Sequence, residues 1–129
     1  MHTLPIRVYY EDTDMAGVVY YANYLKYIER GRSEALRALG IDQTAMRENG
    51  LVFVVRRLTA DYMAPARFDD DLTVFTRTEA VKGASATMIQ WVRREDQTLF
   101  RAEVQIACMD LDGRPQRLPT EVRQALVET

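Results

Sequence analysis

The stretch YYANYLKYIERGRSEALRALG, residues 20–40, carries the clearest structural signal in the chain. Its small and apolar side chains recur at steps of three and four residues, which is the spacing of one face of an α-helix. These positions are Tyr20, Tyr24, Tyr27, Ile28, Gly31, Ala35, Ala38 and Leu39. Gly40 is a typical C-terminal stop. We therefore expect one amphipathic helix of about twenty residues, some 30 Å long.

Gly31 lies on the apolar face of this helix rather than at one of its ends. A glycine within a helix costs about 1 kcal/mol relative to alanine. We expect this cost to be offset by a close approach of the helix to a sheet at Gly31.

The segments on either side of the helix have features typical of β-strands. Residues 4–11, LPIRVYYE, are expected to form a first strand. Four further strand-like segments follow the helix, at residues 51–63, 72–81, 84–95 and 99–110. In the last of them, apolar and polar residues alternate, as they do in a strand with one buried face. Two short helical segments complete the pattern, at residues 42–49, opened by Asp42, and at residues 119–127.

This order of elements predicts a single α+β domain spanning residues 1–129, with a five-stranded antiparallel sheet. Strands that follow one another along the chain usually pair antiparallel through short turns. One helix covers so wide a sheet only if the sheet curls around it. The remaining sheet surface and the sheet edges favour contact with a second subunit, so we expect an oligomer.

Composition excludes several classes of protein. Seventeen basic and nineteen acidic residues leave a net charge of −2, without the basic excess typical of nucleic-acid-binding proteins. No segment approaches the ~20 apolar residues needed to span a bilayer, and residues 1–14 show no secretory signal. The single cysteine, Cys108, excludes an intrachain disulfide. We expect a cytoplasmic protein. One cysteine and one histidine, His2, also do not suffice for a zinc site of the usual type.

Three acidic residues, Glu11, Asp12 and Asp14, precede the long helix, followed by Gly17. In one interpretation these carboxylates cap the helix or form an Asx turn. In the other, Asp14 is a base or nucleophile beside the unpaired N–H groups of the helix N-terminus, which can hold an oxyanion. This second interpretation needs no histidine if the leaving group is as good as a thiolate.

The same stretch resembles the signature of the 4-hydroxybenzoyl-CoA thioesterase family. The matching positions are Arg7-Val8, Thr13-Asp14, Gly17-Val18-Val19 and Ala22-Asn23-Tyr24. The resemblance extends through residues 29–41 and 53–70 and through the turn at residues 82–85, and so covers most of the chain. Within the family, the sequence is most similar to the YbgC-type acyl-CoA thioesterases, which are associated with the Tol-Pal system.

The resemblance implies a hot-dog fold, in which an antiparallel sheet wraps around a long helix. It also implies an obligate dimer, often paired into a tetramer, with active sites at the subunit interface. The implied reaction is hydrolysis of acyl-CoA to a free acid and CoA, without a metal or redox cofactor. Asp14 matches the family's catalytic aspartate, which acts as nucleophile or general base. The backbone N–H of Tyr21 matches the group that polarises the thioester carbonyl.

Relatives of the YbgC type often have a histidine where this chain has Tyr21. The backbone role of this position survives the change, whereas any acid or base role of an imidazole is lost. A weakly catalytic protein that binds or scaffolds acyl carrier protein or cell-envelope partners is therefore the alternative function. A hot-dog hydratase or dehydratase is disfavoured, because such enzymes typically pair a histidine with an acid and the only histidine is His2.

Further contacts with the substrate are expected from residues in the motif and in two basic turns. They are Gly17, Val18, Asn23, Tyr24, Arg67, Lys82 and Ser85. The last three are candidates for contacts with the CoA phosphates or pantetheine, and ordinary solvated turns are the alternative interpretation. Met88, Trp91 and Cys108 are expected in the core, with Cys108 as buried filler rather than nucleophile.

Overall fold

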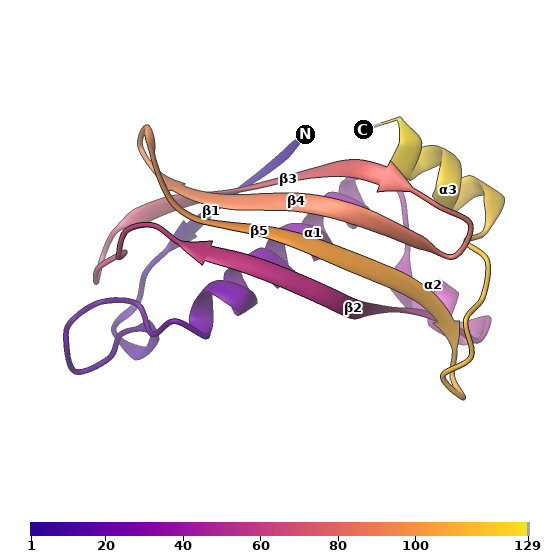
Figure 1. The fold of residues 1–129 in the computed structure, drawn as a ribbon, viewed down its shortest axis with the longest axis horizontal. Helices are drawn as coiled ribbons and strands as arrows, with labels where there is room; N and C mark the ends of the chain where they lie inside the picture. The colour runs from indigo at the N-terminus through magenta and orange to yellow at the C-terminus, as the bar shows by residue number, and fades with distance from the viewer. Residues whose placement is uncertain (129) are drawn as a thin grey trace.

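A five-stranded antiparallel sheet lies across the long helix α1 in the computed structural model, which describes residues 1–128 (Figure 1). Thr129, the last residue of the predicted domain, lies outside the described residues. The strands are β1 His2–Arg7, β2 Leu51–Tyr62, β3 Asp71–Val81, β4 Ser85–Arg94 and β5 Gln97–Asp110. The helices are the 3₁₀-helix η1 Tyr10–Asp12 and the α-helices α1 Asn23–Ala38, α2 Gln43–Glu48 and α3 Thr120–Val127. The predicted α+β class and the five-stranded antiparallel sheet are confirmed.

The strand order is β1-β3-β4-β5-β2, and every pair of neighbours is antiparallel. β3, β4 and β5 follow the expected pairing of consecutive strands through short turns. β2 departs from it, because β2 pairs with β5 and is separated from β3 by two strands. The connection between β2 and β3, residues 63–70, therefore runs from one side of the sheet towards the other. β1 and β2 form the two edges of the sheet.

The first strand and the long helix are both shorter than predicted, for one local reason. Asp12 accepts a hydrogen bond from Tyr9 N at 2.9 Å, and this side-chain contact closes the turn of η1 where a strand was expected. The carbonyl of Asp12 then accepts from Tyr20 N and from Asn23 Nδ2, both at 2.9 Å. Residues 20–22 are held in a turn by these bonds, so α1 begins at Asn23 rather than at Tyr20.

Gly31 lies close against the sheet, as predicted. A Cβ atom added at Gly31 would stand 2.6 Å from Val74 Cγ1 and 3.2 Å from Gln90 Nε2. The fully buried Gln90 side chain uses this proximity, donating from Nε2 to Ile28 O at 2.7 Å. Its Oε1 accepts from Arg32 Nη1 at 2.9 Å. The close approach at Gly31 thus allows Gln90 of the sheet to hydrogen-bond to α1, and both polar atoms of its side chain have a partner.

The core lies between α1 and the sheet. Met88 and Cys108 are buried there, as expected, and Phe100 stacks on Tyr24 with ring centroids 5.0 Å apart. The expectation for Trp91 is wrong, because its ring is only partly buried and stacks on Phe75 at 5.1 Å. Trp91 differs by one position from the core-facing residues of β4, so its side chain points to the opposite face of the sheet.

None of the helices within residues 1–128 is long and apolar enough to cross a membrane.

Candidate active site

Asp14 opens a tight hairpin that precedes α1. Asp14 N donates to Val18 O at 2.9 Å, and Gly17 N donates back to Asp14 O at 3.0 Å. Gly17 has a φ of 78°, a left-handed conformation that favours glycine. Thr13 and Val19 form an antiparallel bridge at the base of the hairpin. The hydrogen bonds within residues 13–19 therefore fix the backbone position of Asp14, from which its carboxylate extends.

The Asp14 carboxylate is exposed, and its two oxygens differ in their contacts. Oδ1 accepts a hydrogen bond from Ala16 N at 2.9 Å, which is an Asx turn. Oδ2 has no hydrogen-bond partner among residues 1–128. The two interpretations of this carboxylate are thus compatible, because one oxygen holds the turn while the other is free for chemistry.

Asp12 has only a structural role in these contacts. Its side chain caps η1 and its carbonyl anchors the segment before α1. Glu11 is exposed beside it. Asp12 is thus a capping residue, but of η1 and not of the long helix that was expected, because the N-cap of α1 is Ala22.

The Asp14 hairpin rests on the loop of residues 63–70. Val18 forms a bridge with Arg67, and Val19 N donates to Ala66 O at 2.8 Å. Ala66 N in turn donates to the hydroxyl of Tyr24 at 2.9 Å. Burial raises the pKa of this Tyr24 hydroxyl, so it stays a neutral partner for the loop at physiological pH. Gly17 and Val18 therefore lie in the same hairpin as Asp14, and Arg67 lies in the loop that contacts this hairpin.

Tyr21 lies in the turn before α1, not in the first turn of the helix. Its carbonyl accepts from the Tyr62 hydroxyl at 2.9 Å, whereas its N–H has no hydrogen-bond partner among the described residues. Ala22, the N-cap of α1, provides no side-chain cap. Asn23 N and Leu25 N already donate to Tyr20 O and Ala22 O. The N–H of Tyr21 is therefore a donor without a partner just ahead of the N-terminus of α1, where the helix dipole is positive.

Asp14 and Tyr21 lie on adjacent segments of chain. The bridge between Thr13 and Val19 and the bond from Tyr20 N to Asp12 O bring the two segments side by side. The segment that carries the free Asp14 oxygen is thus paired with the segment that leads to the unpartnered N–H of Tyr21. This combination is suited to attack on a carbonyl group and to stabilisation of the resulting oxyanion.

The structure gives Asn23 and Tyr24 contacts within the chain. Asn23 Nδ2 donates a hydrogen bond to the carbonyl of Asp12. Tyr24 is buried, and its hydroxyl accepts a hydrogen bond from Ala66 N. Their predicted contacts with the substrate remain predictions.

Lys82 and Ser85 lie at the opposite end of the sheet from Asp14. Lys82 follows β3 and Ser85 begins β4, and the eleven residues of β3 separate this turn from the loop of residues 63–70. At about 3.3 Å per residue this is roughly 35 Å. Within one chain the structure therefore does not bring Lys82 and Ser85 to Asp14.

The segments that carry the site also present a group of exposed apolar side chains that was not expected from the sequence. Tyr10, Met15, Tyr21, Tyr62, Met63 and Phe68 are each at least 48% exposed. The Tyr21 ring packs against Tyr20 at 4.9 Å and against Tyr62 at 6.2 Å. Their clustering in the motif and in the loop of residues 63–70 was a signal for a binding or association surface.

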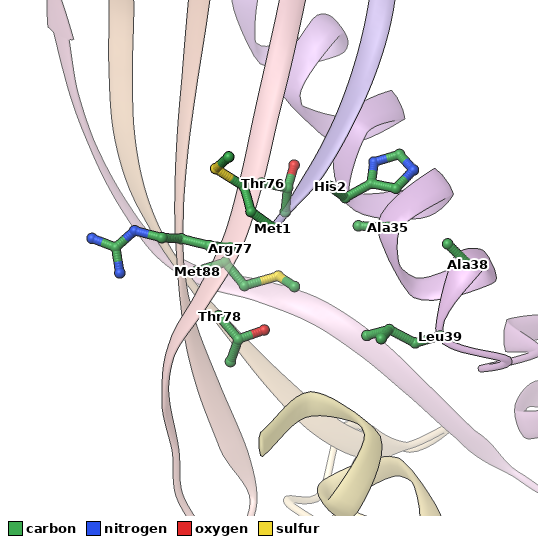
Figure 2. A pocket seen from close by; sticks show the side chains of 9 residues that line it. All are labelled: Met1, His2, Ala35, Ala38, Leu39, Thr76, Arg77, Thr78 and Met88. Carbon is green, nitrogen blue, oxygen red and sulfur yellow. The ribbon is translucent and has the colours of Figure 1, made fainter. Parts of the chain in front are cut away.

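Hollows also border α1 elsewhere, and two of them lie against the sheet. One, of about 200 Å³, lies between α1 and β2 and is lined by Glu29, Arg32, Phe53 and Val55 among others. The other, of about 150 Å³, lies between the C-terminal half of α1 and the start of β1, where His2 is labelled (Figure 2). The second hollow is distant from Asp14, because β1 reaches the loop of residues 63–70 only at its opposite end.

The profile of the thioesterase-like superfamily matches residues 8–126. The chain belongs to this superfamily. It is 46% identical over 125 residues to an acyl-CoA thioesterase YbgC of Haemophilus influenzae, a match covering 95% of this chain and 92% of the relative. It is 42% identical over 120 residues to an acyl-CoA thioester hydrolase YbgC of Escherichia coli, with 92% and 90% covered.

A solved structure agrees with this assignment. The crystal structure of a probable thioesterase from Bartonella henselae matches with a TM-score of 0.87 and 41% identity, over 92% of this chain and 98% of that one. The predicted membership of the YbgC-type thioesterases, the hot-dog fold and the enzyme class are confirmed by these likenesses.

Among residues 1–128, no three His, Cys, Asp or Glu side chains are grouped so that they could hold a metal ion.

Proposed function

We propose that this thioesterase hydrolyses acyl-CoA thioesters to a free acid and CoA. Two relatives more than 40% identical over at least nine tenths of this chain are named for this activity. The observation that carries the proposal is a free Asp14 oxygen and an unpartnered Tyr21 N–H on two segments that pair with each other ahead of α1.

Asp14 drives the attack on the thioester carbonyl carbon, either directly as nucleophile or as general base on a water molecule. In the first case the carbonyl forms an anhydride with Asp14, which water then hydrolyses. In both cases the C–S bond breaks and the sulfur leaves as a thiolate, which takes up a proton in water. A thiol has a pKa near 8.5, so this departure needs no strong general acid.

The N–H of Tyr21 donates to the carbonyl oxygen as negative charge develops on it. Such a backbone donor is worth most where it has no competing partner and water is excluded. The ring of Tyr21, packed between Tyr20 and Tyr62, supplies an apolar wall at this position instead of an imidazole. The acid and base chemistry thus falls to Asp14.

We further propose a homodimer formed through the free edge of β2, with the substrate bound between subunits. β2 has β5 as its only neighbour in the sheet, and its other edge is unpaired within residues 1–128. Val55 on this strand is 48% exposed and borders the hollow between α1 and β2. In such a dimer Lys82 and Ser85 reach a site only from the other subunit. Pairing of two dimers gives the expected tetramer.

Steady-state hydrolysis of a panel of acyl-CoAs, from short to long chains, tests this function. A parallel panel of the same acyl groups on acyl carrier protein separates the two carriers. We expect turnover on at least one acyl-CoA, and a preference for one range of chain length. Hydrolysis of the acyl groups only when they are carried by acyl carrier protein would contradict CoA as the carrier and show acyl carrier protein in its place. Binding without turnover on either carrier would contradict the proposal and favour the scaffold alternative.

A further inference from the structure

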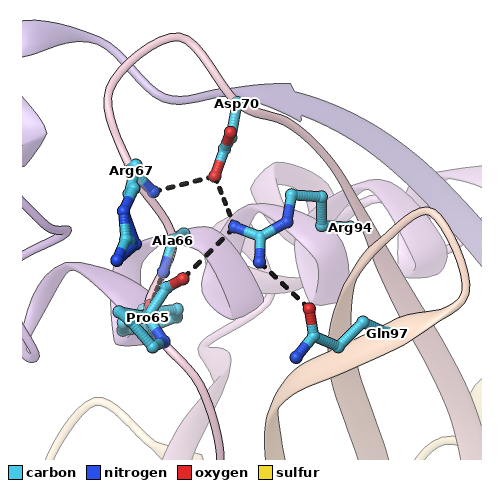
Figure 3. A network of polar contacts seen from close by, with 7 residues as sticks. Pro65, Ala66, Arg67, Asp70, Arg94 and Gln97 are labelled. Carbon is cyan, nitrogen blue, oxygen red and sulfur yellow. Dashed lines mark hydrogen bonds and ion pairs between the residues drawn. The ribbon is translucent and has the colours of Figure 1, made fainter.

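One arginine joins the two ends of the loop on which the Asp14 hairpin rests. Arg94, at the end of β4, donates from Nη1 to Pro65 O at 3.2 Å and to Asp70 Oδ2 at 2.7 Å (Figure 3). Its Nη2 donates to Gln97 Oε1 at 3.0 Å, which orients the guanidinium. Pro65 and Asp70 stand near the start and at the end of the loop of residues 63–70, so Arg94 fixes the width of that loop.

Asp70 extends this connection into the loop. The oxygen that accepts from Arg94 also accepts from Arg67 N at 2.8 Å, and Asp70 O accepts from Val8 N at 3.0 Å. The side chains of Asp70 and Arg94 are only 23% and 30% exposed. In each of the other ion pairs within residues 1–128, at least one side chain is 48% exposed or more. The Asp70–Arg94 pair is therefore the least screened of them.

The residues that this pair holds are the ones that contact the hairpin. Ala66 O accepts from Val19 N, and Arg67 forms the bridge with Val18. A path of direct contacts thus runs from Arg94 through residues 65–70 to the two strands of the hairpin that begins at Asp14. Within residues 1–128, the hydrogen bonds and the ion pair of Arg94 go to Pro65, Asp70 and Gln97, and none goes to Asp14 or Tyr21.

We propose that Arg94 is a positioning residue for the Asp14 carboxylate. It acts through Asp70 and the loop of residues 63–70. This loop sets the position of the Asp14 hairpin relative to the Tyr21 N–H. This inference rests on the proposed function of Asp14. A misplacement of about 1 Å at a catalytic group can lower a rate by roughly 100-fold, so the loop is a sensitive point of control.

The kinetic test compares Arg94→Ala and Arg94→Lys with the matched control Arg93→Ala. Arg93 is the preceding arginine of β4, and it contacts Asp96 and the Phe75 ring instead of the loop. We expect kcat of Arg94→Ala to fall by about 10- to 100-fold, with KM changed by less than about threefold. Lysine keeps the charge but not the fork of donors, so Arg94→Lys should lie between Arg94→Ala and the wild type.

A second measurement separates positioning from a general loss of structure. If Arg94 acts through Asp14, then adding Arg94→Ala to Asp14→Asn should change the residual kcat by less than about twofold, because the two effects share one cause. Full additivity of the two effects, or an equal loss in Arg93→Ala, would overturn the proposal. Asp70→Asn provides a milder variant that keeps an acceptor for Arg67 N, and it should reproduce the kcat effect of Arg94→Ala.

Amide hydrogen exchange of the full-length protein tests the same claim without any turnover. In Arg94→Ala, the amides of Val19 and Asp14, which bond to Ala66 O and Val18 O, should exchange at least about tenfold faster, while those within α1 stay unchanged. Unchanged exchange at these two amides would overturn the positioning role even if the wild type proves inactive. Altered exchange in an inactive wild type would instead count against the proposed function alone.

Discussion

Gly31 is a residue at which helix α1 packs against the sheet without room for a side chain. The atom nearest to an added Cβ would be Val74 Cγ1, at 2.6 Å, on a fully buried valine. A β-branched side chain has few rotamers with which to move away. The helix therefore accepts a poor helix former here in exchange for contact with the sheet.

We predict that Gly31→Ala destabilises the protein, although alanine is the better helix former by about 1 kcal/mol. Overpacking of a buried site costs typically about 1–3 kcal/mol, which outweighs that gain. Urea unfolding should show a lower midpoint. Adding Val74→Ala should restore part of the loss, because it removes the clashing methyl groups. A Gly31→Ala protein as stable as the wild type would contradict this account.

Cys108 is the only thiol in the chain and lies fully buried on β5. Burial raises the pKa of this thiol above its ordinary value, so the reactive thiolate is disfavoured near neutral pH. We predict that a thiol reagent labels the native protein at least about 100-fold more slowly than the unfolded one. Fast labelling, or loss of turnover in Cys108→Ala, would show that Cys108 has a functional role.

The elements of the fold were predictable from sequence to different degrees. The strand-like segments predicted after α1 agree with all four strands to within two residues. In β5 the prediction rested on period-two alternation, because burial on one face shows directly in residue type. The start of α1 was placed at Tyr20 instead of Asn23, because the competing bonds of Asp12 involve a carbonyl that no side-chain pattern reveals. The pairing of β2 with β5 was likewise missed, since periodicity identifies a strand but not its neighbour.

The residues of the candidate site were likewise predictable from sequence only in part. Asp14 and Gly17 were found because the motif spacing places them in a turn before a helix. Asp70 and Arg94 were not found, because 24 residues separate them and their pairing depends on how β2 and β3 are connected. The free N–H of Tyr21 was expected from resemblance at the helix start, and the structure places it in the preceding turn.

At the scale of the whole molecule, one chain leaves the site open. Asp14 is exposed, and apolar side chains such as Met15 and Phe68 surround it without cover from residues 1–128. Electrostatic stabilisation of an oxyanion is strong only where water is excluded. The open site and the unpaired β2 edge together favour a dimer that closes both.

We predict that Val55→Arg disrupts this dimer. Two-fold symmetry places the new charge on both subunits near the same interface, and we expect the dimer dissociation constant to rise by about 100-fold or more. Sedimentation velocity over a range of concentrations measures the change. Val127→Arg is the matched control, because Val127 is also an exposed valine but lies on α3. A monomeric wild type, or equal effects of the two variants, would contradict the proposed interface.

The most direct test of the central claim is the kcat of Asp14→Asn on the best acyl-CoA substrate. Asparagine keeps an oxygen that can accept from Ala16 N, so the Asx turn survives while the carboxylate is lost. The exposed neighbour Glu11→Gln is the matched control and should keep wild-type turnover. We predict a fall in kcat of about 10² to 10⁴ for Asp14→Asn. Wild-type turnover in Asp14→Asn would contradict the assignment of Asp14 as the group that drives hydrolysis.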